Sequence, residues 1–311
     1  MNCLLLGGGG FLGLNLSNAL SAQGHRVKIF DRLATILRLQ RRGFDHFEWA
    51  EGDFANERDV SEAMQNCEIV FHLVSTTLPK SSNQNPAYDI ESNVISTIHM
   101  LEAARQKKIK MVLFPSSGGT VYGVSTEIPI KESHPTEPTC SYGIGKLVIE
   151  KYLRLYFELY GLEYRILRIA NPYGEEQRAT GSQGAVAVFL SRALNGHAIE
   201  IWGDGSVVRD FLHVADVSEA FIKAMNYQGE NRLFNIGAGM GHSINELLTE
   251  IETLIGRPVI RNYLPTRGFD VPINVLDISR AKDILGFQPK ISLREGLTRT
   301  LNWLQANGIQ H

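Results

Sequence analysis

The sequence predicts an α/β protein built on a Rossmann-type, doubly wound parallel sheet, with a smaller α/β lobe for the substrate. Three observations support this class. Short apolar runs alternate with segments of helical periodicity through the first half of the chain, which is the pattern of a parallel sheet covered by helices on both faces. A glycine cluster follows the first run, at Gly7, Gly10 and Gly13. The fourth run, Ile69–Leu73, is almost wholly apolar, as a strand buried on both faces requires.

The composition is that of a soluble protein with an ordinary hydrophobic core. Hydrophobic residues make up 43% of the 311 residues and the formal net charge is -2, so nothing favours nucleic acid or an anionic membrane as a partner. Cys3, Cys67 and Cys140 lie far apart, which indicates no metal site and a reducing compartment. No apolar stretch approaches about 18 residues and no signal sequence is visible. We therefore expect a cytoplasmic protein.

The first apolar run and its glycines form a candidate phosphate-binding turn. The run Asn2–Leu6 predicts a strand, and Phe11 to Leu20 has helical spacing. Glycines between a strand and a helix let the backbone approach a pyrophosphate at the helix N-terminus, where free N–H groups favour anions. The residues expected to contact the cofactor here are Gly7, Gly10, Phe11, Leu12 and Gly13.

Asp31 ends the second predicted strand, Val27–Phe30. A carboxylate roughly 20 residues past the glycines holds the ribose hydroxyls of a dinucleotide. Its charge repels a 2′-phosphate, which favours NAD over NADP, although the neighbouring Arg32 weakens that argument. Both residues are placed in the cofactor site. The alternative is that Asp31 only caps the helix predicted over 33–39.

The ends of the next strands supply further cofactor candidates. Asp53 follows the strand predicted over Phe47–Ala50 and would reach the adenine amino group, unless it only caps the next helix. Asn93 lies near the start of a long helix predicted over Tyr88–Gln106. His72 is interpreted as a core histidine. The other candidates at these strand ends are Phe54, Leu73, Val74, Ser75 and Ser116.

Tyr142 and Lys146 form the candidate catalytic pair. At i and i+4 of the helix predicted over Ser141–Gly161, they share one face. A free tyrosine titrates near pH ~10, and an ammonium beside it would lower that pKa and let Tyr142 act as a base. Taken alone, this spacing more often marks a packed ring and a solvated amine. The helix carries apolar residues on more than one face, so it could pair with its copy in a homodimer or pack within one chain.

From Glu175 onward the alternation of strands and helices loosens. Short strands are predicted over Ile199–Trp202 and Val207–Phe211. The predicted helices are Ala185–Leu194, Ser243–Ile255 and Ser292–Leu304. This tail cannot form a second doubly wound sheet, so we expect a smaller lobe that caps the nucleotide-binding domain, with a substrate cleft between the two. The expected division is residues 1–174 for the NAD-binding domain, about 210–238 returning to it, and 175–311 for most of the substrate lobe.

Taken in order, the motifs of the chain resemble those of the extended short-chain dehydrogenases, the nucleotide-sugar epimerase/dehydratase family, over nearly the whole length. Each motif is modest alone, but their order on the predicted elements is specific. The matching elements are Gly7-x-x-Gly10-x-x-Gly13, Asp31, Asp53, Asn93, the block from Ser116 to Gly123, Tyr142-x-x-x-Lys146, Arg168-x-x-Asn171-Pro172-Tyr173-Gly174, Gly203-Asp204-Gly205, Arg209-Asp210-Phe211 with His213 and Asp216, and Arg267-x-x-Asp270.

Within the family the chain is most similar to UDP-glucose 4-epimerases, which implies tightly bound NAD and a UDP-sugar substrate. The resemblance implies that Tyr142 takes the proton of the sugar 4-hydroxyl while the C4 hydride passes to NAD, and that the 4-keto sugar turns over and takes the hydride back. Lys146 would tune Tyr142 and hold the nicotinamide ribose. Arg209 and Arg267 would bind the diphosphate, unless they are solvated surface residues. Trp202 would line the uracil or else lie in the core. The other implied substrate contacts are Ser117, Gly118, Asn171, Asp270 and Asn274.

Two departures from the family pattern bear on the reaction. Gly118 replaces the serine or threonine that usually stands four residues before the tyrosine of the Val-Tyr-Gly motif. Ser117, or else Thr120, would supply that hydroxyl, and we assign the role to Ser117. Gly119 and Thr120 stand where the family's dehydratases and decarboxylases place an acid, which favours epimerisation. The competing interpretations are a 4-keto-sugar reductase and a non-catalytic NAD-binding regulator.

Asn274 bears on the size of the sugar pocket. It stands seven residues after Arg267, where the similar epimerases carry a tyrosine if they are confined to glucose and galactose, and a small residue if they admit N-acetylated sugars. We therefore expect UDP-N-acetylglucosamine and UDP-N-acetylgalactosamine to be accepted alongside UDP-glucose and UDP-galactose. The alternative is that Asn274 only caps the loop before Asp277.

Overall fold

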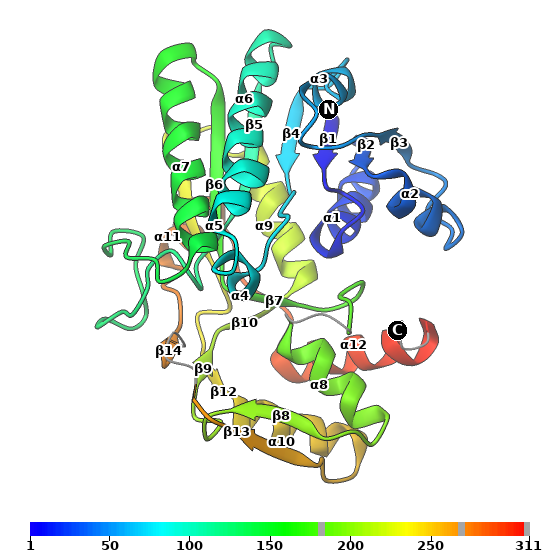
Figure 1. Cartoon of the computed structure of the whole chain (residues 1–311), viewed down its shortest axis with the longest axis vertical. Coiled ribbons are helices and arrows are strands. Elements are labelled where there is room, and N and C mark those ends of the chain that lie inside the picture. The colour runs from blue at the N-terminus through cyan, green and yellow to red at the C-terminus, as the bar shows by residue number, and fades with distance from the viewer. Residues whose placement is uncertain (180–183, 267–270, 308–311) are drawn as a thin grey trace.

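A computed structural model describes residues 1–179, 184–266 and 271–307 of the chain. Within these residues, a seven-stranded parallel sheet with the order β11-β6-β5-β4-β1-β2-β3 forms the larger lobe, and shorter strands form a smaller lobe beneath it (Figure 1). The strands of the large sheet are β1 (Asn2–Leu6), β2 (Arg26–Asp31), β3 (Glu48–Glu51), β4 (Ile69–His72), β5 (Met111–Ser117), β6 (Glu163–Ile169) and β11 (Leu233–Ile236). The predicted fold class is therefore confirmed.

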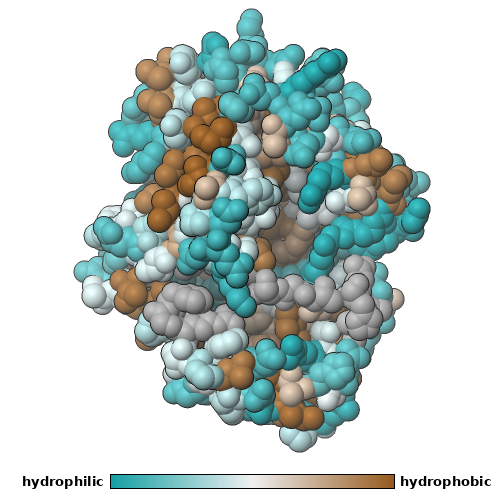
Figure 2. Space-filling view, viewed as in Figure 1, coloured by the Kyte–Doolittle hydropathy of each residue, from teal (hydrophilic) through white to brown (hydrophobic). Residues whose placement is uncertain are grey.

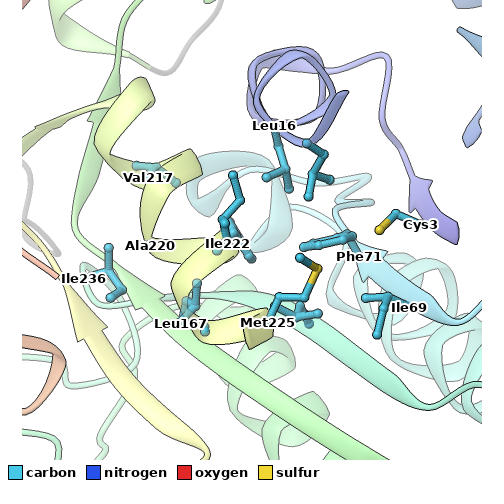
Figure 3. Packing of buried hydrophobic residues seen from close by; sticks show 14 of the residues in the cluster. Cys3, Leu16, Ile69, Phe71, Leu167, Val217, Ala220, Ile222, Met225 and Ile236 are labelled. Atoms are coloured by element: carbon cyan, nitrogen blue, oxygen red, sulfur yellow. The ribbon is translucent and has the colours of Figure 1, made fainter. Parts of the chain in front are cut away.

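Helices cover both faces of this sheet, and the alternation of side chains along β1 shows the two cores. Leu5 belongs to the core beneath α1 and α9, whereas Leu4 belongs to the core beneath α3, α6 and α7. Figure 3 shows the first core, in which Leu16 of α1 and Ile222 of α9 lie near Phe71 of β4. The helices of the larger lobe are α1 (Phe11–Ala22), α2 (Leu33–Gln40), α3 (Glu57–Ala63), α4 (Pro79–Ser82), α5 (Pro86–Asp89), α6 (Ser96–Gln106), α7 (Ser141–Tyr160), α9 (Val214–Asn226) and α11 (Ser279–Leu285).

The segment Tyr88–Gln106 is helical throughout, as predicted, but it is not a regular α-helix over its whole length. A π-helical segment, η1 (Ile90–Ile95), separates α5 from α6. Side chains compete there for main-chain groups, because the Asn93 amide donates to the Asp89 carbonyl at 3.1 Å and the Ser96 hydroxyl to the Glu91 carbonyl at 3.2 Å. Such π-segments frequently occur at functional sites.

The smaller lobe has a separate hydrophobic core between its helices and a pair of strands. It contains no second doubly wound sheet within the described residues, as predicted. Its helices are α8 (Ala185–Leu194), α10 (Ile244–Ile255) and α12 (Leu293–Asn307), and its paired strands are β8 (Ile199–Trp202) and β13 (Arg261–Leu264). Two further small sheets join the lobes: β7 (Asn171–Tyr173) with β10 (Phe211–His213), and β12 (His242–Ser243), β9 (Val208–Arg209) and β14 (Ile273–Asn274).

The single strand predicted over Val207–Phe211 is two strands, β9 and β10, which are divided at Asp210. The Asp210 carboxylate is fully buried and accepts hydrogen bonds from the main-chain N–H groups of Ala238, Gly239 and Leu276. The chain therefore changes from one small sheet to the other at this residue.

Among the described helices, none combines the length and the apolar character needed to cross a membrane.

Candidate active site

The predicted cofactor residues meet at the carboxyl ends of the large sheet, the edge at which open α/β sheets bind ligands. Gly7 follows β1, Asp31 ends β2, Ser75 follows β4 and Ser117 ends β5. The turn after β1 is closely packed, because a Cβ on Gly7 would lie 3.0 Å from the Val74 nitrogen, and its φ of +75° favours glycine.

The first turn of α1 is suited to an anion. Gly10 is the N-cap and supplies no side-chain acceptor, so the N–H groups of Phe11 and Leu12 point outward from the helix end without a capping oxygen. A side chain on Gly13 would collide with the backbone of Gly8, which allows the turn and the helix to approach closely. These features fit the pyrophosphate of a dinucleotide.

Asp31 is held at the glycine turn. One carboxylate oxygen accepts the Gly9 N–H at 3.0 Å and the other accepts the Arg32 N–H at 2.8 Å. The N-cap of α2 is Arg32 and not Asp31. The alternative that Asp31 caps this helix is therefore wrong. Asp53 likewise does not cap α3, since the cap is Asn56.

Lys146 is buried beneath the ring of Tyr142 on α7. Its ammonium lies 5.5 Å from the centroid of the Tyr142 ring and 4.5 Å from that of Phe114, and it donates to the Pro115 carbonyl at 3.0 Å. Burial lowers the pKa of Lys146 to about 8, while the negative charges of Asp89 and Glu150 act in the opposite direction. The pair is therefore not a packed ring with a solvated amine.

The expected lowering of the Tyr142 pKa by Lys146 was wrong for the protein alone. Burial raises the pKa of Tyr142, nearby Cys140 and Asp89 raise it further, and only the Ser75 hydroxyl acts to lower it. The ammonium is directed at the Pro115 carbonyl below the ring and not at the phenol oxygen. A further positive charge at the ring is needed before Tyr142 can serve as a base near neutral pH.

Gly118 has no room for the hydroxyl that the family usually places there. A Cβ at this position would lie 2.5 Å from Leu276 Cδ1 and 3.2 Å from the Arg168 carbonyl oxygen. Ser117 beside it is only partly buried. The Thr120 hydroxyl is buried without a hydrogen-bond partner among the described residues, and both residues keep a side-chain oxygen at this end of β5.

Asn274 lies against Gly118. Its side chain is buried and its amide nitrogen donates to the Gly118 carbonyl at 3.0 Å, while its amide oxygen has no partner among the described residues. Asp277 makes the hydrogen bond that begins the next turn, accepting the Ser279 N–H at 2.8 Å. The alternative that Asn274 only caps this loop is therefore wrong.

The remaining substrate candidates are placed less uniformly. Arg209 is the register partner of Asn274 between β9 and β14 and donates to the Val271 carbonyl at 2.7 Å. Trp202 is 37% exposed, so it is not a core tryptophan. The Asn171 amide donates to the Asp210 carbonyl at 3.2 Å. Arg267 and Asp270 lie outside the described residues.

Two features of the core adjoin these candidates. His72, as predicted, is a buried core histidine, with its Nε2 2.8 Å from the Thr97 hydroxyl. Both ends of the Asn93 side-chain amide make hydrogen bonds within the protein. Its oxygen accepts the Thr76 N–H at 3.0 Å and its nitrogen donates to the Asp89 carboxylate at 3.0 Å.

A buried ion pair behind β5 was missed from the sequence. Glu150 accepts from Arg168 at 2.9 and 2.6 Å and from the Ser116 hydroxyl at 2.5 Å. It ties the end of β5 to α7 and β6 directly behind Ser117. Glu150 stands four residues after Lys146 on the same helix, and this spacing is the signal that could have indicated it.

Comparison with known proteins agrees with this geometry. Residues 3–237 match the model of the NAD dependent epimerase/dehydratase family. The chain belongs to this family. It is 37% identical over 310 residues to a putative UDP-glucose 4-epimerase of Methanocaldococcus jannaschii, covering 98% of each protein. It is 30% identical over 310 residues to a dTDP-4-dehydro-6-deoxyglucose reductase of Escherichia coli, covering 96% of each.

Solved structures of epimerases superpose on almost the whole length of the chain. The UDP-glucose 4-epimerase of Thermotoga maritima, crystallised with UDP-glucose, is 35% identical, with a TM-score of 0.91 and 99% of each chain covered. The UDP-glucose 4-epimerase of Thermus thermophilus, in complex with NAD, is 30% identical, with a TM-score of 0.91, 98% of this chain covered and 99% of that one. The cofactor of this NAD-dependent family member is accordingly NAD, which the glycine turn and Asp31 fit.

Proposed function

We propose that the protein is an NAD-dependent 4-epimerase of a UDP-sugar, with UDP-glucose and UDP-galactose as first candidates and a 4-keto sugar as intermediate. The observation that carries this proposal is the absence of a free acid beside the Tyr142–Lys146 pair in the described residues. Gly119 and Thr120 occupy the positions of the dehydratase and decarboxylase acids. The nearby carboxylates of Asp89 and Glu150 are bonded to side chains of the protein. Chemistry that moves protons beyond C4 would therefore find no free acid beside the pair among the described residues.

Each residue of the site has a role in this proposal. NAD, when bound at Gly7 to Gly13 and Asp31, supplies the hydride acceptor and a positive charge. Tyr142 takes the proton of the sugar 4-hydroxyl, since a base must stand beside the carbon that loses the hydride. Ser117 holds the same hydroxyl from the end of β5. Lys146 places a positive charge below the ring, and we propose that this charge favours the phenolate of Tyr142 only together with the positive charge of bound NAD.

The substrate site would lie between the carboxyl edge of the large sheet and the smaller lobe. Arg209, together with Arg267 and Asp270, would bind the UDP diphosphate. Trp202 has an exposed ring with which to cover a uracil. Asn274 and Gly118 would border the sugar, with Asn171 at the end of the neighbouring strand pair.

We also propose that the protein forms a homodimer through α7. Ile144, Leu155 and Leu159 share one face of this helix and are 47%, 41% and 59% exposed. Figure 2 shows apolar side chains gathered where Figure 1 draws α6 and α7. Replacing Leu155 and Leu159 with glutamate should convert a dimer to a monomer in analytical ultracentrifugation, and a wild-type monomer would contradict the proposal.

Incubation of the purified protein with UDP-galactose and no added cofactor tests the proposed reaction. Formation of UDP-glucose supports epimerisation with retained NAD. A 4-keto sugar that is reduced only when NADH or NADPH is supplied would identify a reductase, and no conversion under either condition would identify a non-catalytic protein. Tyr142→Phe is the matched control, because it keeps the ring and removes the proton acceptor. It should lower turnover by about 10²–10⁴-fold.

A further inference from the structure

Asp89, the last residue of α5, is a buried carboxylate with a complete set of uncharged hydrogen-bond donors. It is 2% exposed. One oxygen accepts from the Thr77 hydroxyl and from the Asn93 amide, the latter at 3.0 Å. The other oxygen accepts the Ser141 hydroxyl at 2.6 Å. A carboxylate bonded in this way is held in one position and keeps its charge close to the residues around it.

The Ser141 contact fixes the first turn of α7, immediately before Tyr142. The N-cap of this helix, Cys140, supplies no side-chain acceptor. Instead the Ser141 N–H donates to the Asn83 side chain at 2.9 Å and the Tyr142 N–H donates to the Ser82 hydroxyl at 3.0 Å. The segment that contains α4 and α5 therefore holds the start of the catalytic helix, and the positive end of the helix dipole favours an anion there.

Asp89 also lies against the turn of α7 that carries Lys146, because a Cβ on the preceding Gly145 would lie 3.9 Å from an Asp89 carboxylate oxygen. No carboxylate among the described residues forms an ion pair with the buried ammonium, and the negative charges of Asp89 and Glu150 both act to raise the pKa of Lys146. Glu150 is neutralised by a bidentate contact with Arg168. Asp89 forms no ion pair with a cation among the described residues and is bonded only to uncharged donors, so its negative charge is the one left uncompensated.

The other titratable groups around the pair are neutral. Burial lowers the pKa of His72 on β4 to about 3. Burial raises the pKa of the Cys140 thiol. Both groups are therefore uncharged near neutral pH, and neither can replace the charge of Asp89.

We propose that Asp89 is a positioning residue for the Tyr142–Lys146 pair: it anchors the first turn of α7 through Ser141 and supplies the negative charge that keeps Lys146 an ammonium below the Tyr142 ring. The proposal rests on the role of this pair in the proposed function. It does not depend on the identity of the sugar.

Asp89→Asn tests the charge because it keeps the shape and one acceptor oxygen. Removing a nearby anion makes the ammonium less stable and the phenolate more stable, so the pKa values of Lys146 and Tyr142 should both fall, by about one unit. The direct measurement is a titration of tyrosinate absorbance in the NAD-loaded protein, with the Tyr142→Phe protein subtracted. The pH–rate profile of turnover should move to lower pH by the same amount.

Two variants control for other causes. Ser141→Ala removes the hydrogen bond from Ser141 to Asp89 without changing the charge. It should slow turnover while leaving the pKa of Tyr142 unchanged. Glu91→Gln removes an exposed charge from the adjoining segment and should change neither. If Asp89→Asn does not fold, Asp89→Ser, which leaves space for a water, is measured in its place.

An unshifted tyrosinate titration in the neutral Asp89 variant would overturn the proposal and leave Asp89 as a structural anchor alone. This titration requires no substrate. Its failure is therefore distinguishable from a failure of the proposed epimerase activity, which would appear as absent sugar conversion in the wild-type protein.

Discussion

Leu276 closes the space above Gly118, so that a Cβ at position 118 would lie 2.5 Å from Leu276 Cδ1. Leu276 is fully buried and packs with Val121, Tyr122 and Ile130, so it cannot move aside freely. Gly118→Ser should therefore destabilise the protein by about 1–3 kcal/mol, as overpacking does. Thermal unfolding measures this loss, and the added change Leu276→Ala should relieve the collision. An unchanged melting temperature in Gly118→Ser would show that the position tolerates a side chain.

Because a side chain does not fit at position 118, we expect Ser117 to make the hydrogen bond to the reacting substrate hydroxyl. Ser117→Ala should lower kcat by about 10²-fold, the size expected for loss of a group that holds the reacting oxygen. Thr120→Val, which keeps the shape of the threonine, is the matched control and should have a much smaller effect. The reverse order in single-turnover measurements would move the role to Thr120.

Asn274 is expected to set the tolerance for N-acetylated sugars. Asn274→Tyr should lower kcat/KM for UDP-N-acetylglucosamine and UDP-N-acetylgalactosamine by 10-fold or more, roughly the discrimination that a steric change in a pocket provides, and should affect UDP-glucose and UDP-galactose less. Asn274→Ala controls for the lost hydrogen bond to Gly118. Equal losses for all four sugars in Asn274→Tyr would show that the residue supports the strand and does not select the sugar.

Arg42 and Glu176 should help retain the cofactor. Their side chains form two hydrogen bonds of 2.8 Å that join the segment after α2 to the loop after β7. The end of α2 adjoins the glycine turn, since a Cβ on Gly9 would lie 3.1 Å from Leu39 Cδ1. The pair is partly shielded, at 22% and 11% exposure, so Arg42→Met should cost about 1–3 kcal/mol and increase the loss of NAD during gel filtration. Arg58→Met breaks an exposed pair with Glu62 and should change little. Equal NAD content in both variants would contradict this role.

His72 should make the protein sensitive to acid. The Thr97 hydroxyl donates to the Asn93 carbonyl, so His72 Nε2 carries the proton that reaches Thr97, and Nδ1 is left without a partner among the described residues. Burial lowers the pKa of His72 to about 3, whereas an unfolded histidine titrates near ~6.5. The unfolded state therefore binds more protons between these values, and stability falls as the pH decreases from about 6.5 toward 3.

Replacing this histidine should flatten that part of the stability profile. His72→Phe fits between the rings of Phe54 and Phe114 and should reduce the loss of unfolding free energy between pH 6.5 and 4.5 by roughly 2 kcal/mol. Urea unfolding at a series of pH values measures it, with the exposed His197→Gln as control. Parallel profiles for wild type and His72→Phe would show that another group causes the acid sensitivity.

The parts of the fold that depend on local pattern were predictable from the sequence. The glycine turn, Asp31 at a strand end and the spacing of Tyr142 and Lys146 follow from periodicity and motif. The Tyr142 pKa was mispredicted because burial raises it and the Lys146 ammonium is directed at the Pro115 carbonyl. Burial of a helix face is set by elements far away in the chain. The roles of Leu276 against Gly118, and of Asp89 against Ser141, depend on contacts between distant segments that no local pattern records.

The position of β11 has a consequence for how the chain is made. This strand pairs with β6 at the edge of the large sheet, yet it follows α8, β8 and the small strands in the sequence. During translation, one edge of β6 therefore remains unpaired while the first half of the smaller lobe is synthesised. The cofactor-binding sheet is completed only when Leu233–Ile236 has been synthesised. The two lobes mature together, and a single cut in the chain cannot release either of them whole.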